Sequence, residues 1–173
     1  MASQTQTEPA TTTTVSSLSV SETLDRDGFV IIPSVVKGAE LESLRRASQE
    51  VTKLARDGKW PYLRTLPKQF PPWSSDPSNG IWGVQHLMHP DMPNQPEFAA
   101  SYFADFVLNP VKEIIGCDND DELIMALDNL LVRPDKDIEL RWHRDDIPPT
   151  ATDEEELERL NKPGFHAQWN LAL

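Results

Sequence analysis

The sequence lacks a second cysteine and any long apolar stretch. Cys117 is the single cysteine among 173 residues, so no disulfide can form within the chain. A lone thiol is compatible with a reducing compartment. No segment approaches the ~20 consecutive apolar residues that a transmembrane helix needs, and we therefore expect no membrane partner.

Positive charge is also scarce. There are 16 basic residues against 28 acidic ones, the net charge is -12, and lysine and arginine gather nowhere. Because nucleic acids are bound mainly through clustered cations, we expect no nucleic-acid partner. The leader up to Ser21 holds neither a basic residue nor an apolar run, unlike a secretory signal or an Arg-rich presequence. We expect a soluble, cytoplasmic protein.

Two regions differ in composition. Residues 1–22 are rich in threonine and serine and poor in apolar side chains, which predicts a disordered tail. Residues 23–173 have the size of one ordinary domain. Helical and strand patterns both occur in this domain, so the predicted fold class is α+β.

The strongest helical pattern lies between Leu41 and Leu54, and Gly58 follows it as a C-terminal stop. Three shorter helices are predicted over residues 96–103, over residues 110–115 and in an acidic stretch through Leu160. The 110–115 helix has Asn109 as cap, Pro110 in the first turn and Gly116 as stop. The acidic helix begins with a capping box of Thr152 and Glu155 and is terminated by Pro163 and Gly164.

Strands are predicted where apolar or alternating runs are short and bounded by turn residues. The predicted strands are residues 29–32, 123–132, 138–143 and 165–173. The segment from Trp60 to Pro96 is dense in proline, glycine and aromatic residues, which predicts a loop packed on the body of the fold. Such a loop would contribute to substrate specificity, and the sequence does not identify the substrate.

His143 and Asp145 form the pattern that carries chemistry. Side chains at i and i+2 of a strand project to the same face, so the imidazole and the carboxylate are expected to point together. They would supply two of the three ligands of a 2-His-1-carboxylate iron(II) site. The alternative is a histidine hydrogen bonded to a nearby aspartate, which the same spacing allows.

Several motifs around this pair resemble the phytanoyl-CoA dioxygenase family in order and spacing, over about residues 24–173. The motifs are DGFVIIP ending at Pro33, TLPKQFPPW from Thr65, GVQHLMHP from Gly83, WHRD ending at Asp145 and HAQWNLAL from His166. The resemblance implies helices packed on a double-stranded β-helix, or jelly roll. It also implies iron(II), 2-oxoglutarate as cosubstrate, O₂, and hydroxylation of a small organic molecule.

The resemblance implies further binding residues for 2-oxoglutarate. Trp169 would lie near the cosubstrate, Asn129 or Leu131 would border the same pocket, and Lys68 would pair with a cosubstrate carboxylate. Core packing for Trp169 and solvation for Lys68 are the alternatives. Gln168 becomes a candidate only if its face of the last strand looks inward, which a one-residue change of register would decide.

The sequence departs from the family in its downstream part. Family members place a second metal histidine and a cosubstrate-anchoring cation on later strands, and His166 does not match that histidine. We therefore expect residues 23–173 to form the N-terminal half of the domain, an incomplete jelly roll with little turnover of its own. Uncovered strands would favour self-association, so a noncatalytic interaction module is the alternative. A cupin-like isomerase or hydrolase would need more histidine ligands.

Overall fold

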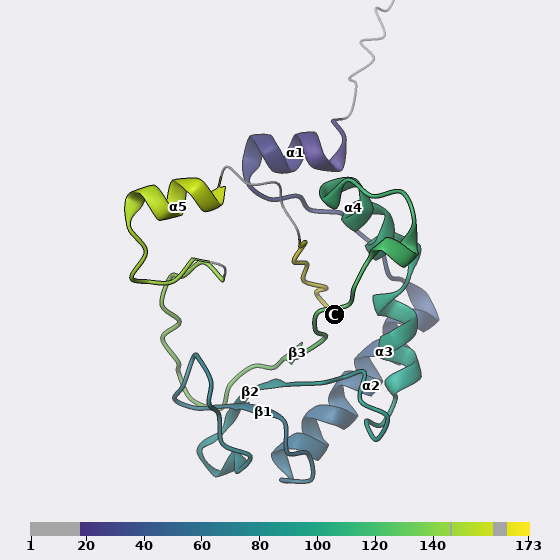
Figure 1. Ribbon diagram of the computed structural model, residues 1–173. Helices are drawn as coiled ribbons and strands as arrows, with labels where there is room; N and C mark the ends of the chain where they lie inside the picture. The colour runs from purple at the N-terminus through teal and green to yellow at the C-terminus, as the bar shows by residue number, and fades with distance from the viewer. Residues whose placement is uncertain (1–17, 146, 161–165) are drawn as a thin grey trace, which may run out of the picture. The chain divides into compact units, whose positions relative to one another are not determined.

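The computed structural model describes residues 18–145, 147–160 and 166–173. The chain forms two compact units, one ending at Ile31 and the other running from Ile32 to Leu173. The described residues contain five helices and one small antiparallel sheet, which confirms the mixed α+β class (Figure 1). The helices are α1 (Val20–Asp27), α2 (Gly38–Arg56), α3 (Gln95–Tyr102), α4 (Asp105–Ile115) and α5 (Asp153–Leu160); the strands are β1 (Leu63–Thr65), β2 (Ile81–Val84) and β3 (Leu130–Leu131).

In the first unit, α1 begins with a reciprocal capping box. The Ser19 hydroxyl accepts a hydrogen bond from the Glu22 backbone N–H, and the Glu22 carboxylate accepts one from the Ser19 backbone N–H. The boundary predicted at residue 22 therefore falls inside a helix, while residues 1–17 lie outside the described residues. The strand predicted over residues 29–32 is wrong, because this segment has no strand partner and Ile31 is 76% exposed.

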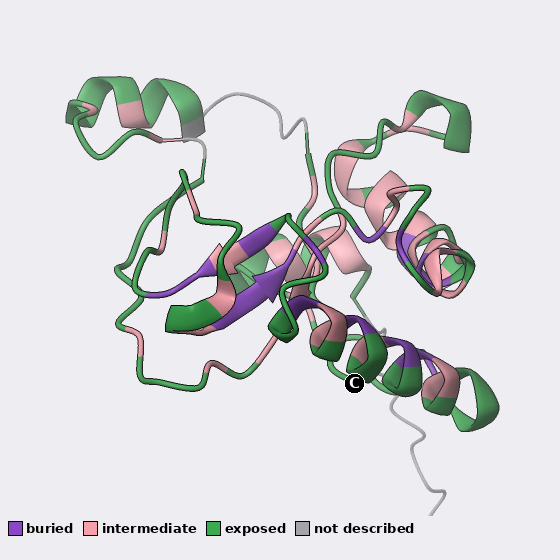
Figure 2. Cartoon of the chain, turned by 90° about the horizontal axis from the view of Figure 1, so that it is seen from below, coloured by how far each residue is buried: buried purple, intermediate pink, exposed green. Residues whose placement is uncertain are grey.

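In the second unit, α2 confirms the strongest helical prediction. Its apolar stripe is buried while its other faces are exposed (Figure 2). Gly58 adopts a φ of 71°, which suits the glycine at a helix stop. No helix of the described residues has the length and apolarity to cross a membrane.

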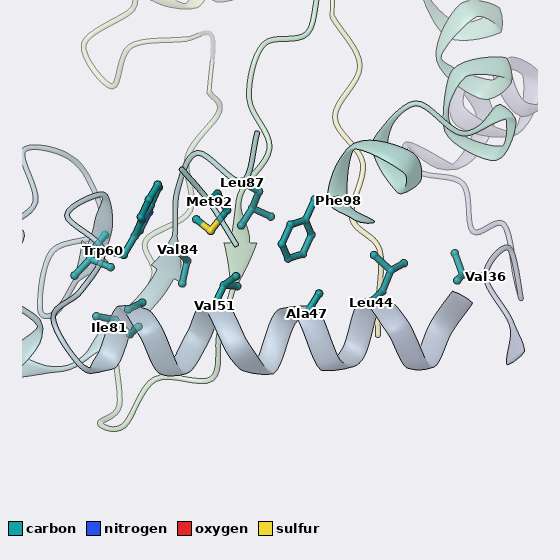
Figure 3. Packing of buried hydrophobic residues seen from close by; sticks show 12 residues of the cluster. Val36, Leu44, Ala47, Val51, Trp60, Ile81, Val84, Leu87, Met92 and Phe98 are labelled. Atoms are coloured by element: carbon teal, nitrogen blue, oxygen red, sulfur yellow. The ribbon is translucent and has the colours of Figure 1, made fainter. Parts of the chain in front are cut away.

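The core lies between α2 and β2. Figure 3 shows Val51 pointing toward Val84, and Ala47 and Leu44 pointing toward Phe98. The side chains of Val51, Ile81 and Val84 are fully buried. Burial of one such side chain contributes roughly 1.5–3 kcal/mol, so this contact positions the sheet on the helix.

The sheet has the order β1-β2-β3, and all its pairs are antiparallel. Its first two strands lie inside the segment predicted as a packed loop. They are three and four residues long, which is too short for a strand pattern to stand out among prolines and glycines. In the register of this pair, Arg64 lies opposite Gly83.

The later strand predictions are mostly wrong for the described residues. The run 123–132 contributes only β3, residues 138–143 form no strand, and residues 166–173 form none either (Figure 1). Residues 161–165 lie outside the description. Trp142 is fully exposed, although the alternating pattern predicted a half-buried strand with Trp142 on its apolar face. Because a strand requires a hydrogen-bonded neighbour, alternation alone does not produce one.

The short helices follow their end signals to different degrees. The predicted 96–103 helix is confirmed as α3 with a shift of one residue. The start predicted at Pro110 is wrong, since α4 begins at Asp105, contains the proline and buries Val107. Packing of that first turn outweighs the hydrogen bond that proline removes. For α5, the capping box of Thr152 and Glu155 is confirmed, and the terminators Pro163 and Gly164 lie outside the described residues.

Candidate metal site

His143 and Asp145 turn their side chains toward a common point. The distance from His143 Nε2 to Asp145 Oδ1 is 3.2 Å, and both side chains are partly exposed. An isolated bridge between Arg144 and Ile147 closes the turn that holds them. The convergence expected from the i, i+2 spacing therefore exists, although the segment is not a strand.

Gln69 takes the place of a neighbouring strand beside this segment. Its Oε1 accepts a hydrogen bond from the Arg141 backbone N–H at 2.8 Å, and its Nε2 donates to the Arg141 carbonyl at 2.9 Å. These are the two backbone groups that a paired strand would satisfy. The side-chain amide therefore fixes the backbone two residues before His143.

His143 Nδ1 has one partner of each kind. It lies 2.9 Å from the Arg141 carbonyl oxygen, which accepts hydrogen bonds, and 3.1 Å from Gln69 Nε2, which donates them. With the proton on Nδ1, the ring donates to Arg141 and leaves a lone pair on Nε2 facing the Asp145 carboxylate. With the proton on Nε2, the ring donates to Asp145 and accepts from Gln69. Only the Nε2-protonated tautomer offers Asp145 a donor, whereas the Nδ1-protonated tautomer sets the Nε2 lone pair against the carboxylate, which a cation between them would offset.

A hollow of about 440 Å³ is lined by His143 and its neighbours Trp142 and Arg144. Phe70 packs edge-on against the His143 ring, with ring centroids 5.0 Å apart. Arg144, which also lines the hollow, forms an ion pair with Glu156 of α5. Asp146, which follows Asp145 in the sequence, lies outside the described residues.

The donor set fits half of an iron(II) site. Ligands about 2.1 Å from a metal on adjacent octahedral positions lie about 3 Å apart, close to the separation observed here. Histidines that bind metals usually donate their other N–H to a carbonyl or carboxylate, and the Arg141 carbonyl offers such an acceptor. Within the described residues, no group of three His, Cys, Asp or Glu side chains could hold a metal ion. His166, which is exposed, belongs to no such group.

Two polar residues near the pair were not singled out from the sequence. Gln69 lies within the TLPKQFPPW motif, but its role depends on a contact with a segment more than seventy residues later in the chain. Arg64 of β1 is half-buried, and burial lowers the pKa of its guanidinium while the Asp145 carboxylate opposes that change. No local sequence pattern reports either of these long-range contacts.

Lys68 lies in the same segment as Gln69. Its ammonium donates to the Pro72 carbonyl at 3.0 Å. Its own carbonyl oxygen accepts hydrogen bonds from the indole N–H groups of Trp73 and Trp82, at 2.9 and 3.0 Å. Its pairing with a cosubstrate carboxylate stays a prediction.

The other predicted cosubstrate residues contact a different part of the fold. Asn129 Oδ1 accepts a hydrogen bond from the His86 backbone N–H at 3.2 Å, and the Trp169 ring lies 5.6 Å from that of Tyr102 in α3. Trp169 is half-buried whereas Gln168 is exposed, so the tryptophan face of this segment looks inward.

Leu131 and Asp128 lie close to Asn129 in the sequence. Leu131 lines a groove of about 550 Å³ between α2 and β3. Burial raises the pKa of the Asp128 carboxyl from 3.8 to about 6, and burial together with the Asp128 charge raises the pKa of Tyr102. These contacts place Asn129 and Trp169 near α3 and the end of β2, and His143 near the segment that follows β1.

Comparisons of the chain with protein-family models, with curated proteins and with solved structures give no match. The functional argument therefore depends on the chemistry and geometry of the residues themselves. Of these, the convergence of His143 with Asp145 is the most specific observation.

Proposed function

We propose that the chain is part of an iron(II) and 2-oxoglutarate dependent dioxygenase of the phytanoyl-CoA dioxygenase type, with His143 and Asp145 as metal ligands. The complete fold in this proposal is a jelly roll to which residues 23–173 contribute the N-terminal half. The substrate is a small organic molecule that also enters this site.

A single observation carries the proposal. His143 Nε2 and Asp145 Oδ1 lie 3.2 Å apart, a direct contact whose length also suits adjacent ligands on one metal. The resemblance of the surrounding motifs to the family supports the same assignment. A third ligand is not among the described residues, so the proposed affinity for iron is that of a site with two protein ligands.

The residues around the proposed metal position would have separate roles. Iron(II) with 2-oxoglutarate and O₂ would supply the oxidising chemistry that no side chain provides. His143 and Asp145 would hold the metal, and Gln69 would orient the imidazole through Arg141. Phe70 limits the rotation of the ring.

The proposal is tested by anaerobic binding of Fe²⁺ together with 2-oxoglutarate. Chelation of the ferrous ion by the 2-oxo acid in a protein site gives a visible charge-transfer absorption, which we expect for the wild-type chain. His143→Ala and Asp145→Asn should each abolish it. Asp137→Asn removes the same charge from an exposed position of the same segment and should leave it unchanged. Equal absorption in wild type and His143→Ala would reject the assignment.

A second candidate is a noncatalytic module that associates with another copy of itself. Exposed apolar side chains are frequent around the edge strand β3 and in the segment that follows it. They are Ile124, Met125, Leu127, Leu131, Leu140 and Trp142. Burying such side chains against a second chain would be favourable, and an edge strand offers unpaired backbone groups.

A further inference from the structure

The Arg64 side chain fits where it does because residue 83 is a glycine. It lies opposite Gly83 in the β1–β2 pair. A Cβ atom on Gly83 would come within 2.9 Å of Arg64 Cδ and within 3.2 Å of its Cβ and Cγ. Any side chain at position 83 would therefore displace the arginine. The glycine lets the arginine stem lie flat across β2.

Two tryptophans hold the charged end of this side chain. Arg64 Cζ lies 5.3 Å from the centroid of the Trp73 ring and 4.9 Å from that of Trp82. The rings meet edge to face, and both indole N–H groups donate to the carbonyl of Lys68. Cation–π contact with two fixed rings restricts the guanidinium to one location.

The arginine is held there without a neutralising partner. Its Nε is buried and makes no hydrogen bond with the described residues. No carboxylate of the described part of the chain approaches its nitrogens within 4 Å; Asp145 acts on it only through its electrostatic field. Partly burying a cation without a paired charge is costly, and an anion bound to the guanidinium would offset that cost.

We propose that Arg64 binds the carboxylate of a small organic acid beside the His143–Asp145 pair. A guanidinium presents a planar fork that matches a carboxylate with two parallel hydrogen bonds. The inference deepens the proposed function and rests on it for the position of the metal. It assigns the anion to Arg64 in place of Lys68, whose ammonium is exposed and bonded to Pro72.

Two sources could bring the carboxylate. One is the distal carboxylate of 2-oxoglutarate, and the other is a carboxylate of the primary substrate. Glutarate is a suitable probe because it keeps both carboxylates of 2-oxoglutarate but lacks the 2-oxo group that chelates iron. The quenching of tryptophan fluorescence is a suitable readout, since Trp73 and Trp82 flank the guanidinium.

The experiment titrates the full chain with glutarate in metal-free buffer. We expect saturable quenching by wild type and affinity roughly tenfold or more lower in Arg64→Gln, the size of one charge-assisted interaction. Gly83→Ala should also weaken binding, because it displaces the arginine without removing its charge. Lys68→Gln tests the alternative anchor, which the proposal expects to leave binding intact, and Lys37→Gln at an exposed position is the matched control. Circular dichroism of each variant checks that it folds.

Three results would overturn the proposal. They are no binding by wild type, equal binding by folded Arg64→Gln, and a loss confined to Lys68→Gln. A second arm repeats the titration with 2-oxoglutarate and Fe²⁺ without oxygen. Weaker 2-oxoglutarate binding by Arg64→Gln identifies the cosubstrate as the source of the carboxylate. If instead glutarate still binds the 2-oxoglutarate-loaded protein through Arg64, the source is the substrate.

The experiments test the proposed metal site and the proposed anion site separately. Glutarate binding that depends on Arg64, combined with no iron binding by wild type, would reject the proposed metal site and retain the anion site. Iron binding that depends on His143, combined with glutarate binding indifferent to Arg64, would do the reverse.

Discussion

His143 lies between an acceptor and a donor on one side and a carboxylate on the other. Nε2 faces Asp145 in both tautomers, and it carries the proton in one and a lone pair in the other. A metal ion between the two side chains would favour the tautomer that donates from Nδ1 to the Arg141 carbonyl. Without a metal, direct donation from Nε2 to the carboxylate satisfies both groups. The position of the proton on His143 therefore depends on whether a metal ion lies between the two side chains.

Asp128 gives a prediction at the same scale. Burial raises the pKa of its carboxyl from 3.8 to about 6, so between about pH 4 and 6 the folded state binds a proton that the unfolded state has released. Stability from this group is therefore fully present below pH 4 and is lost as the pH rises through 6. Ionisation in the folded state costs about 1–2 kcal/mol once partial exposure is allowed for.

Asp128→Asn should remove this dependence. We expect the variant to be more stable than wild type at pH 7 by about 1–2 kcal/mol and to lose that advantage near pH 4. Urea unfolding at both pH values measures the difference. Asp118→Asn, which changes an exposed aspartate, serves as the control. An advantage that is constant across the pH range would show that burial of the Asp128 charge is not the cause.

At the scale of elements, the Gln69 side chain makes the backbone hydrogen bonds that a neighbouring strand would otherwise make. Gln69 pairs with both backbone groups of Arg141 in a segment without regular secondary structure. A change that keeps the shape but removes the donor tests whether this pairing supports the site. Gln69→Glu can still accept from the Arg141 N–H, but it cannot donate to the carbonyl or to His143.

We expect Gln69→Glu to bind Co²⁺ with affinity lower by about 10–100-fold, the usual effect of losing a group that orients a ligand. Calorimetric titration measures the affinity, and Gln49→Glu on the exposed face of α2 is the control for added negative charge. Unchanged affinity in Gln69→Glu would mean that His143 needs no support from this segment.

Sequence reasoning identified the elements whose signals are local. The apolar stripe of α2 and the capping box of α5 depend on residues within a few positions of each other, and both predictions are confirmed. The strands depend on partners far along the chain. β2 contains glycine and tryptophan and shows no clear strand pattern in the sequence. Residues 138–143 alternate clearly but have no neighbouring strand in the described part of the chain.

The same distinction applies to the site. His143 and Asp145 are two positions apart, so their convergence followed from the spacing. Gln69 contacts the segment before the pair, and Arg64 interacts with Asp145 electrostatically, in both cases across more than seventy residues, which no single-sequence pattern reports. Metal ligation itself, and the roles of Lys68, Asn129 and Trp169, stay predictions.

At the scale of the whole molecule, apolar surface is exposed around an edge strand. Ile124 is 93% exposed and Leu127 is 60% exposed, which is costly in water for side chains of this size. We expect reversible self-association at high concentration, reduced by Ile124→Lys and Leu127→Lys. Sedimentation velocity over a concentration series measures it. Leu18→Lys, at an exposed apolar position of the N-terminal unit, is the control.

If wild type stays monomeric at every concentration, or if the control variant reduces association as much as the two lysine variants do, this account of the surface fails. Association that persists unchanged in both lysine variants would also contradict it.

The most direct test of the central claim is nitrogen NMR of the imidazole groups during titration with Zn²⁺, a diamagnetic ion that accepts the same ligands. The account predicts that His143 Nε2 shifts on metal binding while Nδ1 carries the proton, and that Asp145→Asn weakens the response. It is contradicted if Nε2 of His143 keeps its proton at saturating Zn²⁺, or if the metal shifts only His86 and His89.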